Sequence, residues 1–430
     1  MIAALYRTLT WAALPAGLLY HWYRSVSRGR RPAFAERFGL LSQQTAAKLA
    51  GGPVIWLHAV SVGEVIAART LVQALRQKYQ GYRLLLSVTT ETGRSVAERD
   101  GLADAVIYFP FDITMAVRRL LHRFAPVLIV IMETEIWPVL TEEAARRGIP
   151  LMLANGRISE RSFPRYRRFA WFFRPVLHRF SLIGMQSAAD LERIVAIGAP
   201  PQRSMLLGNL KYDIPSSPVT PEERSRLRAC YRIPEQAQVL VVASTHPGEE
   251  ALLLPAVHRL CGRFPELVPV LVPRHPERGE QVALLAGQAG FRVLRRSQIE
   301  HWSGECAPGM LLLVDTVGEL MQFYALADLA YVGGSLVPTG GHNLLEPASR
   351  GIAQLFGPYM NNFREVAALT LSYAAGRQVA APEAFEAVAG ELLADPDQRA
   401  ALGAGGLRLL AECGGALARH LAAVAGVLRS

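Results

Sequence analysis

Three glutamates stand where they could act as general bases, each close behind a short apolar run. The same spacing recurs at all three places: Ser61-x-x-Glu64, Thr316-x-x-Glu319 and Asn343-x-x-Glu346. This spacing is typical of a helix capping box, in which the glutamate binds a backbone amide at the start of its own helix. A carboxylate at the mouth of a helix can instead face a ligand and take a proton from it. For Glu64, the local pattern leaves both roles open.

A second group of acidic residues follows the apolar run VLIVIM in the N-terminal half. Glu133 and Glu135 belong to the sequence ETEIWP, and Arg157 follows a further apolar run in NGRIS. Carboxylates so close to a buried strand are costly unless they are paired or functional. Residues 157–179 are rich in arginine and aromatics, which suits an anionic lipid surface, nucleic acid or an ordinary solvated face. No known nucleic-acid motif accompanies them.

Glycine-rich turns make the C-terminal half a candidate nucleotide-sugar site. Gly334 and Ser335 follow an apolar run, and GGHNLLEP comes next, with Glu346 in the first turn of a predicted helix. Small residues let a phosphate approach the backbone, the helix start supplies free N–H groups, and a carboxylate can bind ribose hydroxyls. Arg274, after LVPVLV, can neutralise a leaving phosphate or form a surface ion pair. The turn at Gly318 suits base or ribose contacts, or an ordinary helix cap.

These residues need strands that bring them to one edge of a sheet. Runs such as VIWLHAV, RLLLSVTT and LMLANGRI alternate with helical stretches between residues 53 and 210. After a proline-rich connector at 212–221, the alternation resumes with VLVVAST, LVPVLVPR and MLLLVDT. Short Val, Ile and Leu runs separated by helices indicate βαβ units on buried parallel sheets. We therefore predict an α/β protein of two doubly wound, Rossmann-like domains that face a central ligand cleft.

Composition narrows the choice of partners and cofactors. The chain has 430 residues, of which 51% are hydrophobic and 19% charged, as expected for a folded protein of two domains. Residues 1–214 hold 28 basic and 15 acidic residues, whereas the rest hold 18 and 21. The first half is therefore expected to meet an anionic partner. The four cysteines are scattered and the histidines lack H-x-x-x-H spacing, so we expect neither disulfides nor a metal.

The N-terminus resembles a membrane anchor. Residues 2–23 are mostly apolar and about long enough to span a bilayer, although one arginine and one proline interrupt them. Arg24, Arg28, Arg30 and Arg31 follow directly, and positive charge on that flank places it in the cytoplasm. We predict an uncleaved anchor helix, with a buried or surface-lying helix as the alternative.

In their combination and order, the motifs resemble those of the 3-deoxy-D-manno-octulosonic acid (Kdo) transferases of Gram-negative bacteria. The resemblance is carried by WLHAVSVGE, TTETG, ETEIWP, NGRIS, GNLKYD, STHPGEE, PRHPER, DTVGEL and DLAYVGGSLVPTGGHNLLEPA. It implies a glycosyltransferase-B fold, with CMP-Kdo as donor and the lipid A precursor lipid IVA as acceptor. It also implies a place at the bacterial inner membrane, with the catalytic domains on the cytoplasmic side. The implied partners are therefore CMP-Kdo, lipid IVA and inner-membrane lipids, without nucleic acid.

The resemblance also implies roles for individual residues. Glu64 would be the general base. Beside the resemblance, the chemistry predicts that one displacement inverts the anomeric configuration, and because CMP carries a single phosphate we expect no metal and no cofactor. A base role also requires that the Glu64 carboxylate face the cleft and not the Ser61 amide. The implied CMP contacts are Pro273, Arg274, His275, Val317, Gly318, Glu319, Asn343, Leu344, Leu345 and Glu346. Further acceptor or donor contacts are expected at Ser61, Gly63, Glu133, Glu135, Arg157, Lys211, Gly334 and Ser335.

The predicted domains are an anchor at 1–23, an acceptor domain at 24–214, a linker at 215–223 and a CMP-Kdo-binding domain at 224–430. The last helix of the chain is allowed to cross back to the N-terminal domain. Two other functions compete with Kdo transfer: an inner-membrane glycosyltransferase that uses a different nucleotide sugar, and a membrane-bound nucleotide sensor without activity. A sensor needs no base, so Glu64 argues against the second.

Overall fold

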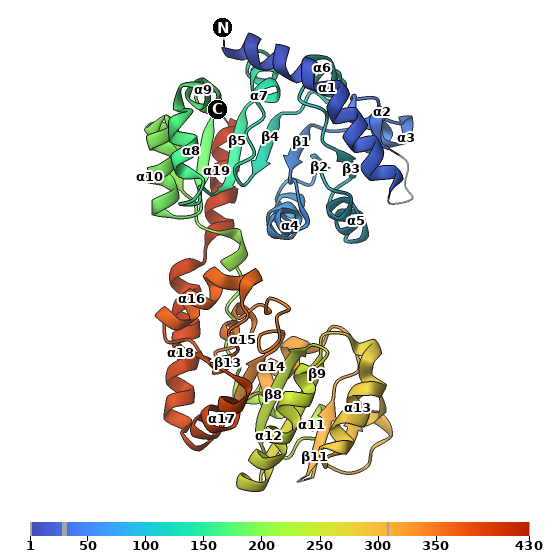
Figure 1. Ribbon diagram of the computed structural model, residues 1–430, viewed down its shortest axis with the longest axis vertical. Helices are drawn as coiled ribbons and strands as arrows, with labels where there is room; N and C mark the ends of the chain where they lie inside the picture. The colour runs from blue at the N-terminus through green and yellow to red at the C-terminus, as the bar shows by residue number, and fades with distance from the viewer. Residues whose placement is uncertain (1, 28–31, 308, 430) are drawn as a thin grey trace. The chain divides into compact units, whose positions relative to one another are not determined.

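The computed structural model describes residues 2–27, 32–307 and 309–429. The chain divides into two compact units: residues 1–213 with 414–430 form the first, and residues 214–413 form the second (Figure 1). The first stretch of the first unit ends at Asp213, and α11 (Pro221–Cys230) begins inside the stretch predicted as linker. The chain returns to the first unit for its last helix, α19 (Ala416–Arg429).

The first unit is built on a seven-stranded sheet in the order β3-β2-β1-β4-β5-β6-β7. Its pairings are parallel, and its central strands are short apolar runs that suit burial between two helical layers. The strands are β1 (Val54–His58), β2 (Arg83–Val88), β3 (Ala105–Tyr108), β4 (Leu128–Met132), β5 (Leu151–Gly156), β6 (Leu182–Met185) and β7 (Ser204–Leu206).

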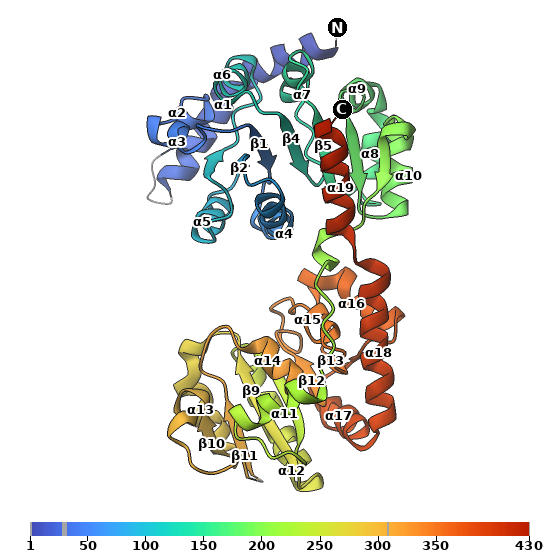
Figure 2. The same cartoon turned by 180° about the vertical axis from the view of Figure 1, so that it is seen from behind.

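Helices cover both faces of this sheet. They are α1 (Ile2–Val26), α2 (Phe34–Arg37), α3 (Gln43–Lys48), α4 (Val62–Lys78), α5 (Glu91–Arg99), α6 (Thr114–Phe124), α7 (Pro138–Ala145), α8 (Phe163–Arg168), α9 (Ala170–Leu177), α10 (Ala188–Ile197) and α19. Successive residues of β1 point to opposite cores, Trp56 to one and Ile55 and Leu57 to the other. Helices α6, α7, α9 and α10 contribute to the first core, and α4, α5 and α19 to the second (Figure 2).

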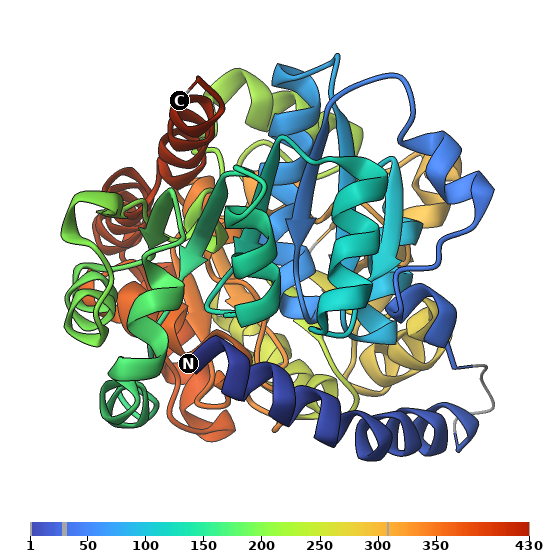
Figure 3. The ribbon, with the colours of Figure 1, turned by 90° about the horizontal axis from the view of Figure 1, so that it is seen from above.

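The predicted N-terminal helix is present as α1, which runs along one side of the first unit, whereas α19 lies across the sheet from it (Figure 3). The Tyr6 hydroxyl donates a hydrogen bond to Asp112 (3.0 Å) and so ties the start of α1 to the unit. None of the helices formed by the described residues has the length and apolar character needed to cross a membrane. The spanning anchor predicted at residues 2–23 is therefore not confirmed. The arginines predicted to flank it, Arg28, Arg30 and Arg31, lie outside the described residues.

The second unit repeats the architecture with the strand order β10-β11-β9-β8-β12-β13-β14, again with parallel pairings. Its strands are β8 (Gln238–Thr245), β9 (Leu267–Pro273), β10 (Arg292–Arg295), β11 (Met310–Leu313), β12 (Leu329–Val332), β13 (Gln354–Phe356) and β14 (Arg377–Gln378). Its further helices are α12 (Glu249–Arg263), α13 (Gly279–Gln288), α14 (Leu320–Leu326), α15 (Leu345–Ser349), α16 (Arg364–Ser372), α17 (Phe385–Ala394) and α18 (Pro396–Cys413). Helices α12, α13 and α17 pack on one face of this sheet, and α11 and α14 on the other.

Candidate active site

The strand order of the first sheet reverses between β1 and β4, which pair directly although β2 and β3 separate them in the sequence. In doubly wound folds, the loops that follow such a pair of strands diverge and leave a crevice for ligands. Ser61, Gly63 and Glu64 come directly after β1, and Glu133 and Glu135 come directly after β4. The predicted acidic residues of the first half therefore lie where this fold binds ligands.

Glu64 lies in the first turn of α4, and only 7% of it is exposed. Its carboxylate accepts hydrogen bonds from the Val60 amide (2.8 Å) and the Ser61 hydroxyl (3.2 Å). In return, Ser61 Oγ accepts a hydrogen bond from the Glu64 amide (3.4 Å). The partner of the carboxylate is thus the Val60 amide and not the Ser61 amide. Glu64 stabilises its own loop and retains oxygen lone pairs that no residue of this loop occupies.

The electrostatic surroundings of Glu64 suit a general base. Burial raises its pKa from 4.5 to about 7, and the negative charges of Glu133 and Glu135 act in the same direction. The hydrogen bonds from Val60 and Ser61 oppose this shift. A base works best when its pKa is near the working pH, so Glu64 combines a reactive protonation state with a fixed position.

The loop after β4 is strained and held by ion pairing. Glu133 has φ of +54°, in the left-handed region, and its amide donates to the Ala154 carbonyl (2.9 Å). Its carboxylate pairs with Lys211 (Nζ–Oε1 3.4 Å), and Thr134 exchanges hydrogen bonds with the backbone of Arg157. Strain of this kind costs about 1–3 kcal/mol and gathers at functional sites. Three predicted contacts, Glu133, Arg157 and Lys211, are therefore connected through this one loop.

A buried polar network beneath these residues was missing from the sequence prediction. Asn155 has φ of +56° and is fully buried; its Oδ1 accepts the Leu210 amide (2.9 Å), and its carbonyl accepts Gln186 Nε2 (2.8 Å). The Asn155 amide donates to Nε2 of His420 in the C-terminal helix (3.1 Å). This network fixes the turn that presents Lys211. Asn155 stands inside the NGRIS motif, but no spacing or composition signal pointed to His420.

In the second sheet, the strand order reverses between β8 and β12. His246 follows β8, Gly334 follows β12, and Arg274 follows β9, the other neighbour of β8. The backbone of Arg274 donates to the Thr245 carbonyl (3.0 Å), while its guanidinium is exposed and without a partner among the described residues. His246 and His342 share a hydrogen bond between their Nε2 atoms (2.8 Å). A free cation and two imidazoles thus meet at the point where this sheet would bind an anion.

Glu319, a predicted CMP contact, is already occupied by protein groups. Its carboxylate accepts hydrogen bonds from Arg296 (2.9 Å), Tyr231 (3.0 Å) and the Thr316 hydroxyl. Burial alone would raise the pKa of Glu319, but these bonds lower it below its usual range. Glu319 therefore holds the loop in place, and the free surface of this loop is formed by Val317, which is 86% exposed, and Gly318.

The predicted contacts from Asn343 to Glu346 differ strongly in access. Leu344 and Leu345 are buried in the core, so only their backbone can meet a ligand. Asn343 Oδ1 accepts the Leu345 amide (3.2 Å) at the start of α15, a helix of five residues. Burial raises the pKa of Glu346, whereas Asn343 and the nearby charge of Arg274 lower it. Glu346 is therefore the one carboxylate of this stretch that lies near Arg274.

Of the other predicted donor contacts, Ser335 and Pro273 are buried, whereas His275 is exposed. The Ser335 hydroxyl is buried and bonded to the Val332 carbonyl (2.6 Å) and the Gly357 amide (2.8 Å), so it supports its turn. Pro273 is buried, whereas His275 is exposed and pairs with Glu277 (3.1 Å). Within the described ranges, no three His, Cys, Asp or Glu residues are arranged to hold a metal ion.

The chain thus has two doubly wound α/β units, with a buried glutamate at the switch point of the first and an exposed arginine beside two histidines at that of the second. Solved structures of the same fold include a glycosyltransferase from Rickettsia africae, with TM-score 0.51 and 12% identity over 88% of this chain and 99% of that one. Another is MurG from Acinetobacter baumannii, with TM-score 0.52 and 11% identity over 86% of this chain and 98% of that one.

The family follows from sequence similarity. Residues 32–214 match the family model described as 3-deoxy-D-manno-octulosonic-acid transferase (kdotransferase). The 3-deoxy-D-manno-octulosonic acid transferase of Haemophilus influenzae is 34% identical, covering 97% of this chain and 96% of its own length. The transferase of the same name from Bordetella pertussis is 35% identical, covering 94% and 95%. This chain belongs to the Kdo transferase family and is a glycosyltransferase.

Proposed function

We propose that this protein transfers Kdo from CMP-Kdo to the lipid A precursor lipid IVA in lipopolysaccharide biosynthesis. The observation that carries the proposal is the buried Glu64 carboxylate. It lies at the switch point of the first sheet, and its pKa is about 7. A sugar hydroxyl is a poor nucleophile at neutral pH and needs such a base. Membership of the Kdo transferase family supports the identity of the transferred sugar.

In the proposed reaction, Glu64 takes the proton of the acceptor hydroxyl while that oxygen attacks the anomeric carbon of Kdo. The bond from this carbon to the CMP phosphate breaks, and the phosphate leaves with the electron pair. One displacement of this kind inverts the anomeric configuration. Glu133 and Lys211 form an ion pair at 3.4 Å beside Glu64 and would orient the hydroxyls of the acceptor sugar.

The donor would bind at the switch point of the second sheet. Arg274 supplies a free guanidinium for the phosphate, and the exposed Gly318 and Val317 offer a surface for the nucleoside. CMP carries a single phosphate, so no metal is needed to chelate a diphosphate, and we propose a reaction without metal or cofactor. Pro273, His275, Asn343 and the backbone of Leu344 and Leu345 would complete the donor surface.

We further propose that the enzyme works on the cytoplasmic face of the bacterial inner membrane. Trp11, Trp22 and Tyr23 of α1 are about half exposed or more, as is Trp171 of α9. A ring contact between Tyr6 and Phe172 (5.9 Å between centroids) brings α1 and α9 together. Amphipathic aromatic side chains of this kind favour the lipid headgroup region, where lipid IVA resides. Flotation with anionic vesicles tests this proposal. Replacing both Trp11 and Trp22 should reduce the fraction of protein that floats with the vesicles.

The deciding experiment is mass spectrometry of lipid IVA incubated with the full chain and CMP-Kdo. We expect one or more mass increments of Kdo, and none with Glu64→Gln. No increment from the folded wild type would contradict the proposal. Transfer from a UDP-sugar in a parallel donor panel would favour the competing assignment, an inner-membrane glycosyltransferase with another nucleotide sugar.

A further inference from the structure

A fully buried carboxylate without a role in the proposed reaction lies under the donor-binding loops. Glu249 is the first residue of α12 and has 0% exposure. The described residues include no cation paired with it; instead, it accepts five hydrogen bonds from neutral donors. Oε1 accepts Tyr331 Oη (2.7 Å), the Ser335 amide (3.1 Å) and the Leu336 amide (3.0 Å), and Oε2 accepts the Gly334 amide (2.7 Å) and the His246 amide (3.2 Å).

These five bonds connect the two loops of the switch point. Three consecutive amides, from Gly334 to Leu336, belong to the turn after β12, and the His246 amide belongs to the loop after β8. Backbone amides this close to one carboxylate are fixed in direction as well as in position. The negative charge is further favoured at the start of α12 by the helix dipole. Glu249 therefore holds both loops to a common point.

The two loops carry the imidazole pair of the site. Gly334 has φ of +64°, and a Cβ atom added there would stand 3.1 Å from the rings of both His246 and His342. The turn held by Glu249 is thus in direct contact with both imidazoles. Their Nε2 atoms bind each other, and the rings lie nearly parallel, 14° apart. Neither Nδ1 has a partner among the residues that the structure describes. In a neutral pair joined by one Nε2–H···Nε2 bond, the ring that accepts at Nε2 carries its hydrogen on Nδ1 and can donate it to a ligand.

We propose that Glu249 is a positioning residue for the transfer reaction: it fixes the Gly334 turn so that the His246–His342 pair presents an Nδ1–H group to an anionic group of the donor. This inference rests on the proposed function only for the identity of the donor. Phosphate and carboxylate, the two anionic groups of a CMP-activated sugar acid, share the chemistry that imidazole N–H groups and Arg274 recognise. The positioning role itself is carried by geometry alone.

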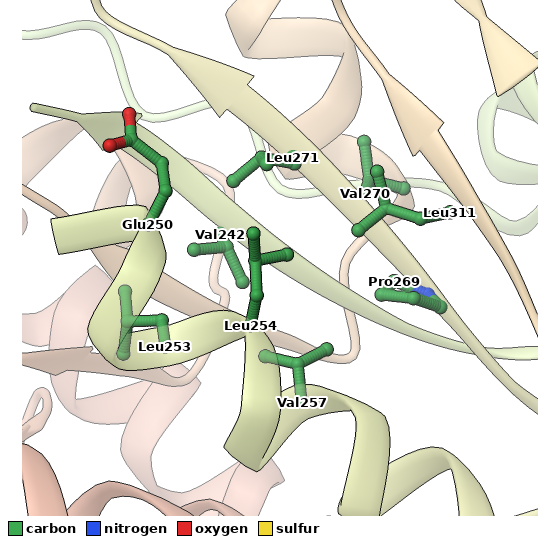
Figure 4. A pocket seen from close by; sticks show the side chains of 9 residues that line it. All are labelled: Val242, Glu250, Leu253, Leu254, Val257, Pro269, Val270, Leu271 and Leu311. Carbon is green, nitrogen blue, oxygen red and sulfur yellow. The ribbon is translucent and has the colours of Figure 1, made fainter. Parts of the chain in front are cut away.

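The neighbouring glutamate shows that this role is specific to Glu249. Glu250 binds Arg278 through both carboxylate oxygens (2.9 and 3.2 Å) and accepts the Thr245 hydroxyl (3.0 Å). Figure 4 shows Glu250 at one end of a pocket whose other lining side chains are apolar, such as Leu253 and Leu271. Glu250 is therefore neutralised by a cation and serves the loop after β9, whereas Glu249 serves the imidazole pair.

Glu249→Gln is the sharpest test because it changes charge and hydrogen bonding with almost no change in volume. The amide oxygen of glutamine can replace one carboxylate oxygen, but its NH₂ group must then face two or three N–H or O–H donors. Each buried N–H or O–H group that loses its acceptor is expected to lower the population of the correctly arranged loops by roughly 5-fold or more. We expect the full-length variant to raise the KM for CMP-Kdo at least ~10-fold, with a smaller change in kcat.

A second readout needs no substrate. In the free protein, the pKa of His246 is lowered by burial, while Glu249 and Glu250 raise it and His275 and Arg274 lower it. The pKa of His342 is lowered to about 4 by burial, His246, Arg274 and His275. Removing the charge of Glu249 should move the His246 titration, followed by imidazole NMR, to lower pH. A folded Glu249→Gln variant with an unchanged donor KM and an unchanged His246 titration would overturn the proposal.

Two further variants keep the test decisive if Glu249→Gln does not fold. Tyr331→Phe removes one donor to Oε1 without changing charge, and we expect a donor KM raised roughly 3-fold; an unchanged KM would overturn the geometric role. Asp328→Asn is the matched control, because Asp328 accepts the Val239 amide (2.8 Å) at the opposite end of β8. An equal rise in donor KM in that variant would also overturn the proposal. If the wild type does not transfer Kdo, the proposed function fails, while the NMR result still decides the positioning role.

Discussion

Replacing the proposed base should stabilise the protein while it abolishes transfer. The pKa of Glu64 rises from 4.5 to about 7 in the native state, so ionising this residue opposes folding at neutral pH. At about 1.4 kcal/mol per pKa unit, the penalty at pH 8 is at most about 3.5 kcal/mol. Glutamine carries no charge and keeps one oxygen for the Val60 amide. Allowing for solvent screening, we expect Glu64→Gln to gain about 2 kcal/mol.

The sign of this effect fixes its pH dependence. Because the native pKa lies above the unfolded value, the native state binds more protons between pH 4.5 and 7, and wild-type stability falls as pH rises through this window. The advantage of Glu64→Gln is therefore largest above pH 7 and fades toward pH 4.5. At about 2–4 °C per kcal/mol for a unit of this size, the Tm should rise by about 4–8 °C at pH 8.

Scanning calorimetry at pH 5 and pH 8 tests this reasoning, and Glu143→Gln is the matched control. Glu143 is also buried in the first unit, but Arg118 and Arg147 lower its pKa against the effect of burial. Its ionised form stabilises the native state, so Glu143→Gln should lower the Tm at pH 8. A Tm of Glu64→Gln that falls at pH 8, or that changes equally at both pH values, would refute the electrostatic account of Glu64.

Three further predictions concern the reaction. The kcat/KM of the wild type should rise with pH to a plateau with a midpoint near 7, so that its value at pH 6 is about a tenth of the plateau. Glu135→Gln, which removes a nearby negative charge, should lower that midpoint; a flat profile from pH 5.5 to 8 would count against Glu64 as base. Arg274→Ala should raise the KM for CMP-Kdo at least ~10-fold, because it removes a charge-assisted bond, and Arg274→Lys should restore part of it; an unchanged KM would remove Arg274 from the donor site. Gly63→Ala should not lower the Tm, since Gly63 lies in the first turn of α4 and a Cβ there meets only Ser61 Oγ at 3.9 Å, yet it should raise the KM for lipid IVA; unaltered acceptor kinetics would show that lipid IVA does not touch Gly63.

The two sheets could be predicted from the sequence because buried parallel strands have no polar face to interrupt their apolar runs. The residues of β1 alternate between two cores, and every one of them is buried, so VIWLH reads as a continuous apolar run. The positions of Glu64, Glu133 and Arg274 could be predicted for the same reason. Each follows such a run, and the carboxyl ends of parallel strands share one edge of a sheet.

What the sequence could not show are partners far away along the chain. The amide of Asn155 meets His420 across 265 positions, and Glu249 meets the turn at Gly334 across 85. No periodicity or spacing encodes contacts of this kind, because they arise only when helices and loops pack. The anchor prediction was limited in the same way: hydropathy described the residues of α1 but could not include the hydrogen bond of Tyr6 to Asp112.

The three capping-box glutamates show how packing assigns different chemistry to one local motif. Glu64 receives only neutral donors and has Glu133 and Glu135 nearby, so its pKa rises to about 7. Glu319 has the same spacing, but Arg296 binds it, so its pKa falls and it is a weaker base than Glu64. Glu346 is buried near Arg274, which offsets part of the effect of burial. The capping spacing places a carboxylate at the start of a helix, and the charges that reach it from distant parts of the chain decide whether its pKa rises, as for Glu64, or falls, as for Glu319.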